Sequence, residues 1–206
     1  KRKMAKVKKA LAKASFFNHE EKTFIAVGGA WRAIANVYME ITSAPLRILQ
    51  NYEVPVSDLR PLLAELANSS KHTDIVQKVA KRRVATIPYA AMVLDVILDM
   101  GKFETLMVSS YGVREGIVFG EMSVEERASD PLDAGLEAMV ASDSHAAEFG
   151  RALSSWVASA AAYTLSPRLT NAACRLVDIG AMLHPDHRAD LAFELVARAP
   201  LPGLTH

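Results

Sequence analysis

The sequence predicts an α/β unit followed by an all-α unit. A strand, a glycine turn and a helix follow one another at residues 24–41, and the same order returns at residues 105–119. These two repeats predict the α/β unit. From residue 130 onward the chain shows helical periodicity rich in Ala and Leu and no convincing strand, which predicts the all-α unit. We expect the boundary at 126/127.

The first strand is expected at residues 24–27, whose apolar and β-branched residues fit a strand covered on both faces. Gly28 and Gly29 permit a sharp turn and let backbone amides approach a ligand. A helix then runs from about Ala30 to Ile41, with Ile41 among its core-facing positions. The N-terminus of such a helix favours an anion. The alternative is that the glycines only allow the strand and helix to pack tightly.

Further elements follow from periodicity and breaker residues. The apolar segment 46–52 fits a short strand, and Ser57 fits the N-cap of a helix over 58–67. Other helices are expected from 73 or 74 to 79 and over 88–100, before a second strand at 105–110. Two glycine turns in one α/β unit place two loops at the same end of a parallel sheet, where ligands gather.

A basic cluster, Lys81, Arg82 and Arg83, follows the helix that ends near residue 79. Cations suit the negative end of a helix dipole, so a solvated helix C-terminus explains the cluster. Contact with a ligand is the alternative. In the second unit, helices are expected to begin at Asp130, at 143 or 144, at 169, and at 185 or 186.

The composition excludes several classes of protein. The chain has 206 residues, half of them hydrophobic, and a net charge of +1, which gives no reason to expect a nucleic acid or a membrane as partner. The most apolar run, 87–100, is interrupted by Asp95 and Asp99 and is too short to span a bilayer. Residues 1–13 fit an amphipathic helix rather than a signal peptide. Lone Cys174 excludes an internal disulfide and fits a cytoplasmic location.

Three stretches together resemble the exopolyphosphatase/guanosine pentaphosphate phosphatase (Ppx/GppA) family. Residues 24–33, Phe-Ile-Ala-Val-Gly-Gly-Ala-Trp-Arg-Ala, resemble its second-lobe glycine motif. Residues 108–116, Val-Ser-Ser-Tyr-Gly-Val-Arg-Glu-Gly, are similar to its S-x-x-G-L-R-E-G signature. Residues 174–188 look like part of its helical HD-like domain. The resemblance covers almost the whole chain in the right order.

The resemblance implies a fold and an activity. Residues 1–126 would form an incomplete α/β ribonuclease-H-like lobe of the actin/Hsp70 type, and residues 127–206 a truncated all-α HD-like domain. Enzymes of the family hydrolyse terminal phosphates of inorganic polyphosphate, or the 5′ phosphate of guanosine pentaphosphate, with Mg²⁺. The family's first phosphate loop, catalytic glutamate and D-I-G-G-G-S loop are not found in residues 1–206.

We therefore expect the C-terminal portion of such a hydrolase, with no catalytic residue and no phosphatase activity on its own. The Mg²⁺ ligands would lie outside it, and the parent enzyme would be a homodimer. The alternative is a non-catalytic module that binds polyphosphate or a guanosine tetraphosphate-type nucleotide, or that supports dimerisation.

The resemblance also carries over candidate residues for binding phosphate: Gly28, Gly29, Arg82, Arg114, Arg175, His187 and Arg188. Arg114 would either form an ion pair with Glu115 that fixes the second turn or line the cleft entrance. Tyr89 stands where the family usually has glycine. This departure from the family pattern argues against carrying over the phosphate-binding role to Arg82.

An HD-type metal site is not expected. His145 and Asp178 stand at plausible places on successive helices, but Val177 occupies the position of the required histidine. His184 and His187 flank residues 185–186 and fit a helix start with surface histidines, with metal ligation as the alternative.

Overall fold

The computed structural model describes residues 2–13, 17, 20–68, 71–141, 143–159, 166–199, 201 and 203–204. This part of the chain forms two compact units, one reaching Ile117 and the other running from Val118 to Leu204. The division falls within one helix, α6 (Val113–Glu121), a few residues before the predicted boundary at 126/127.

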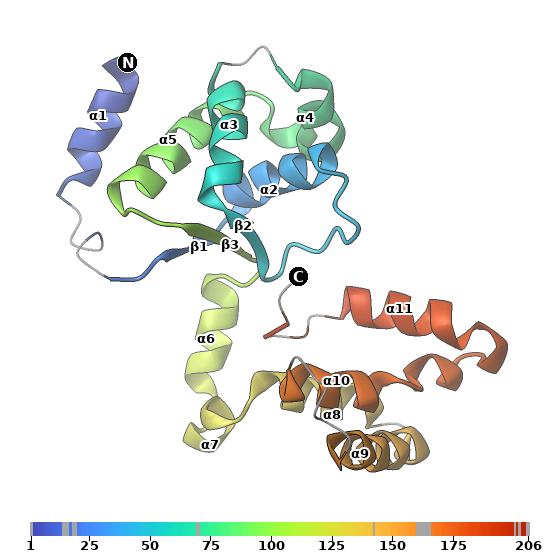
Figure 1. Ribbon diagram of the computed structural model, residues 1–206. Coiled ribbons are helices and arrows are strands. Elements are labelled where there is room, and N and C mark those ends of the chain that lie inside the picture. Colours follow the sequence, from blue (N-terminus) through green and yellow to red (C-terminus); the bar gives the residue numbers. More distant parts are fainter. Residues whose placement is uncertain are drawn as a thin grey trace. The chain divides into compact units, whose positions relative to one another are not determined.

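The described part of the first unit contains one sheet of three strands (Figure 1). Its strands are β1 (Thr23–Val27), β2 (Tyr52–Pro55) and β3 (Thr105–Ser109), in the order β1-β3-β2. β1 pairs with β3 in parallel, and β2 pairs with β3 antiparallel. The expected pair of parallel strands is thus confirmed.

Helices cover one face of this sheet, the face of Ala26, Val54, Leu106 and Val108, all of them buried. In Figure 1, α2, α3 and α5 lie on the same side of the strands. Leucines, valines and isoleucines of these helices form the core with that face. The helices of the unit before α6 are α1 (Arg2–Leu11), α2 (Gly29–Ile41), α3 (Val56–Ala67), α4 (Thr73–Ala80), the 3₁₀ turn η2 (Lys81–Arg83) and α5 (Ile87–Met100).

The expectation that β1 is covered on both faces is wrong. Ile25 and Val27 are 59% and 47% exposed, because the helices pack only against the opposite face of the strand. Ile41, at the end of α2, is also exposed rather than core-facing.

The strand expected at 46–52 is displaced to Tyr52–Pro55, where it finds a partner in β3. α3 then begins at Val56, so Ser57 lies inside the helix and does not cap it. The Ser57 hydroxyl instead donates to Asp58 Oδ1 at 2.9 Å.

The described residues of the second unit form helices and no strand. These helices are α7 (Val124–Ala128), α8 (Pro131–Val140), α9 (Ser144–Ser159), α10 (Pro167–Leu176), α11 (Arg188–Arg198) and the 3₁₀ turns η3 (Ile179–Met182) and η4 (Pro185–His187). The helix expected to begin at residue 169 therefore begins earlier, at Pro167, and ends at Leu176. Leu132, Leu136 and Ile179 belong to its core, and Cys174 is also buried.

An ion pair between Asp130 and Arg168, here called the polar clasp, links the start of α8 to α10. Asp130 caps α8 by accepting from Leu132 N–H at 2.9 Å, and its two carboxylate oxygens each accept from the Arg168 guanidinium at 2.7 Å. Arg168 also donates to the carbonyl of Gly203 at 2.6 Å. The guanidinium and the Leu132 amide lower the pKa of the Asp130 carboxyl from 3.8 to about 2.

In the part of the chain that the structure describes, no helix has the length and apolar character needed to cross a bilayer.

Candidate functional site

The carboxyl ends of β1 and β3 lie side by side. The two strands run parallel in a register that pairs Val27 with Ser109, so both glycine turns leave the same edge of the sheet. A Cβ placed on Gly112 would lie 3.8 Å from Val27 Cγ1. The juxtaposition predicted from the two strand–glycine–helix repeats is therefore confirmed.

The first turn has glycine at two consecutive positions, and its backbone conformation requires glycine at the first of them. Gly28 has a φ of +123°, which other residues rarely adopt. A Cβ on Gly29 would lie only 2.5 Å from Arg83 Nη2, because the Arg83 guanidinium packs against the glycine. α2 begins here without a side-chain cap and without an acidic residue in its first turn. Its N-terminal amides are thus left for another acceptor.

The basic cluster meets this turn through Arg83. The sequence singled out Arg82, but the structure brings its neighbour against Gly29. Lys81, Arg82 and Arg83 form the 3₁₀ turn η2, so successive side chains point in different directions. The sequence alone does not show which of the two arginines lies against the glycine turn, because the directions of their side chains depend on where α4 ends.

The second turn is closed by its own side chains and a nearby glutamine. Gly112 N–H donates to Glu115 Oε2 at 2.7 Å, and Tyr111 N–H donates to Ser109 Oγ at 3.1 Å. Ser110 N–H donates to Gln50 Oε1 at 2.7 Å. The backbone amides of Ser110, Tyr111 and Gly112 are therefore already satisfied within the protein.

Glu115 carries the charge of this second turn. Hydrogen bonds from its own backbone N–H and from Gly112 N–H lower the pKa of its carboxyl, and the positive charges of Arg114 and Arg32 lower it further. Arg114 was expected either to pair with Glu115 or to line the entrance. Among the described residues, no carboxylate oxygen lies within 4.0 Å of a guanidinium nitrogen of Arg114 or Arg32, so neither arginine forms an ion pair.

Arg175 lies in the interior of the second unit. It is 8% exposed, and its Nη1 lies 3.4 Å from Asp133 Oδ1. Its Nη2 lies 2.5 Å from Glu137 Oε1, though not in hydrogen-bonding geometry. The guanidinium thus bridges α10 to α8. This placement argues against the expected contact with polyphosphate, which needs an accessible cation.

His187 and Arg188 are exposed at the start of α11. The ring of His187 lies 4.9 Å from the ring of His184, centroid to centroid, and His184 Nδ1 accepts from Asp186 N–H at 3.2 Å. His184 thus caps η4, as the helix-start interpretation predicted. The described residues contain no group of three or more His, Cys, Asp or Glu that could hold a metal ion.

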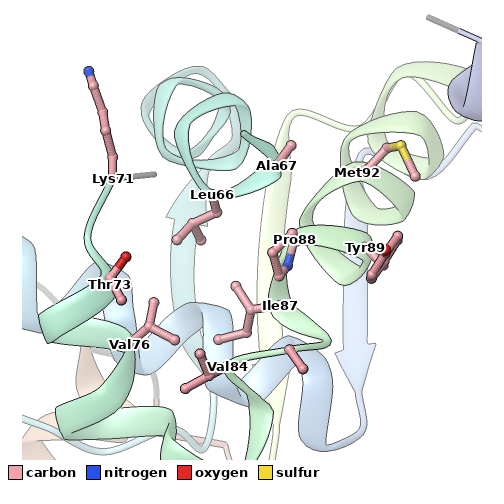
Figure 2. A pocket seen from close by; sticks show the side chains of 11 residues that line it. Leu66, Ala67, Lys71, Thr73, Val76, Val84, Ile87, Pro88, Tyr89 and Met92 are labelled. Atoms are coloured by element: carbon pink, nitrogen blue, oxygen red, sulfur yellow. The ribbon is translucent and has the colours of Figure 1, made fainter. Parts of the chain in front are cut away.

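A separate cavity of about 380 Å³ opens between the end of α3 and the starts of α4 and α5. Figure 2 shows Leu66, Val76, Val84 and Ile87 gathered around it, while the Lys71 side chain extends away. Among the described residues that line it, Lys71 carries the one charge, and its ammonium lies 2.6 Å from Glu65 Oε1. Lys71, Thr73 and Tyr89 are the polar side chains among the described lining residues, and none of the phosphate-binding residues predicted from the sequence belongs to this described lining.

An uncapped helix start and arginines at the carboxyl edge of a partly parallel sheet are features of α/β proteins that bind anions. The model of the Ppx/GppA phosphatase family matches residues 1–125. This is more than half of the chain, so the chain belongs to the Ppx/GppA phosphatase family, as the resemblance indicated. Membership implies an actin-like fold, and the small mixed sheet with its helices is consistent with an incomplete lobe of that kind. No curated protein matches the chain.

Proposed function

We propose that the first unit binds the phosphoryl groups of inorganic polyphosphate, or of guanosine pentaphosphate, at the turn formed by Gly28 and Gly29. The observation that carries this proposal is the open start of α2, which has no side-chain cap and has the Arg83 guanidinium packed beside it. Backbone N–H groups would donate to phosphoryl oxygens, and the arginine would neutralise their charge. Membership of a phosphatase family supports this ligand class.

The parent protein would be a hydrolase of phosphoanhydride bonds, and the chain of 206 residues would bind without hydrolysing. Hydrolysis needs a group that orients the attacking water, and in enzymes of this family that group would be a glutamate carboxylate. Glu115 is the carboxylate at the described edge of the sheet, and it is already held by Gly112 N–H at 2.7 Å. We also propose that the parent enzyme is a homodimer.

The described residues of the site do not fit a Mg²⁺ site of their own. Mg²⁺ demands nearly octahedral coordination by oxygens, chiefly carboxylates, phosphates and water. The turn offers guanidinium and amide donors, and its carboxylate is engaged. Mg²⁺ would therefore reach the turn as a counter-ion of the ligand.

The test combines binding and turnover on the purified chain. Tripolyphosphate is titrated calorimetrically, and phosphate release from long-chain polyphosphate and guanosine pentaphosphate is measured with Mg²⁺. We expect saturable binding and no release above the protein-free control. A Gly29→Val variant is expected to lose binding, because its side chain would occupy the place of Arg83. Absence of binding by the folded wild type would contradict the proposed site, and phosphate release would contradict the non-catalytic assignment.

A second candidate function is a binding or dimerisation module that recognises a guanosine tetraphosphate-type nucleotide. The same open turn would hold its diphosphate. Competition between tripolyphosphate and guanosine tetraphosphate in the titration separates the two ligands by their affinities.

A further inference from the structure

Glu115 lies beside the open turn as well as at the start of its own helix. Its Oε2 lies 3.7 Å from the position of a Cβ on Gly112, and Val27 Cγ1 lies 3.8 Å from that same position. Val27 is the residue that precedes Gly28. The Glu115 carboxylate and the Val27 side chain therefore flank the same point at Gly112, which places the carboxylate on the second turn where that turn meets the end of β1.

Three arginines from three different elements surround this region. Arg32 comes from the first turns of α2, Arg83 from η2 and Arg114 from α6. Among the described residues, none forms an ion pair or a hydrogen bond with the guanidinium group of any of the three. Arg32 and Arg114 nevertheless lie near enough to Glu115 to stabilise its charge. The carboxylate thus shares these cations with any incoming anion.

We propose that Glu115 sets the affinity of the open turn, because its carboxylate is a built-in anion that competes with the ligand for Arg32 and Arg114. This inference rests on the proposed function. Because like charges repel across the short distance between the two turns, the ionised carboxylate lowers the affinity of the Gly28–Gly29 turn for every anion. The alternative is a purely structural role, in which Glu115 only caps the start of α6.

Glutamine at position 115 separates these two roles. Its side-chain oxygen can still accept from Gly112 N–H, so the cap is kept while the negative charge is removed. Glu121 provides the matched control, because Glu121→Gln removes the same charge from the other end of α6.

Calorimetric titration with tripolyphosphate is performed on the full chain and on both variants, at low and at high salt. We expect Glu115→Gln to bind about three- to tenfold more tightly than the wild type at low ionic strength, and Glu121→Gln to bind within about twofold of it. The gain of Glu115→Gln should largely disappear in about 1 M salt, where the Debye length is only about 3 Å. A structural role would produce no such salt dependence.

Equal or weaker binding by a folded Glu115→Gln variant would overturn the inference and leave the proposed function standing. Absence of binding by the wild type and by every variant would overturn both. Should Glu115→Gln fold poorly, Glu115→Asp keeps the charge and is expected to bind like the wild type. A gain in affinity by the aspartate variant would show that the negative charge is not the cause.

Discussion

Two turns of the same kind lie side by side in the first unit, and only one of them is open. Both follow a parallel strand, contain glycine and lead into a helix. After β3, Glu115 reaches back to Gly112 N–H and closes the start of α6. After β1, the first turn of α2 contains no acidic residue and has no side-chain cap. Glu115, with Ser109 and Gln50, satisfies the backbone amides of the second turn, whereas no side chain caps the start of α2, where we propose that the anion binds.

The largest expected effect concerns the two glycines, Gly28 and Gly112. Gly28→Ala forces a side chain into a φ of +123° and should lower the free energy of unfolding by about 1–3 kcal/mol. Gly112→Ala is the control, because its Cβ would meet only ordinary contacts at 3.7 and 3.8 Å. Urea denaturation measures both. Equal destabilisation by the two substitutions would contradict the difference in backbone conformation.

The next effect sharpens the choice between neighbouring arginines. Arg83→Ala should weaken tripolyphosphate binding about tenfold or more, the effect expected for loss of a charge-assisted hydrogen bond. Arg82→Ala removes the same charge one residue earlier and should change the affinity much less, since Arg83 is the one that contacts Gly29. The dissociation constants come from calorimetry. A larger loss in Arg82→Ala would restore the assignment made from the sequence.

A smaller effect tests the closed turn. Glu115→Ala removes the acceptor of Gly112 N–H and should speed hydrogen exchange of the amides in the first turn of α6. Exchange in the first turn of α2 should stay unchanged, because α2 has no such cap. Glu115→Gln is the control and should exchange nearly like the wild type. Faster exchange at both helix starts would show that the two turns are not independent.

The smallest expected effect concerns a third helix start, that of α8, where the Asp130 carboxylate caps the helix and pairs with Arg168. The Asp130 carboxyl has a pKa of about 2 in the folded protein against an ordinary value of 3.8. A lowered folded pKa contributes stability that is present above about pH 4 and is lost as the pH falls toward 2. Asp130→Asn should therefore lower the melting temperature of the second unit at neutral pH and flatten its fall in acid. An unchanged acid dependence in the variant would contradict the clasp between Asp130 and Arg168.

Much of this fold could be predicted because the elements are strongly patterned. β1, α2, α5 and β3 all lie close to their predicted bounds. β2 was misplaced because strand pairing, rather than local apolarity, selects Tyr52–Pro55. The exposure of Ile25 and Val27 could not be predicted either, since it depends on which face of the sheet the helices cover.

The candidate site was predicted as a pair of glycine turns, and its charges were not. Arg32 was missed and Arg83 was named only as a member of the basic cluster, because the positions of these side chains depend on their direction around neighbouring turns. Arg175 was chosen from a resemblance, whereas its burial against α8 is a property of helix packing. One signal was available in the sequence: Glu115 stands three residues after Gly112, the spacing of a helix cap, while Trp31 stands three residues after Gly28.

The most direct test of the open turn is a titration of the ¹⁵N-labelled chain with tripolyphosphate, followed by the amide resonances of Gly29, Ala30 and Gly112. The structure predicts saturable shifts at Gly29 and Ala30, whose N–H groups lack a side-chain acceptor at the start of α2. It predicts little change at Gly112, whose N–H is held by Glu115 at 2.7 Å. Shifts at Gly112 with none at Gly29 and Ala30 would place the anion at the other turn and contradict the account.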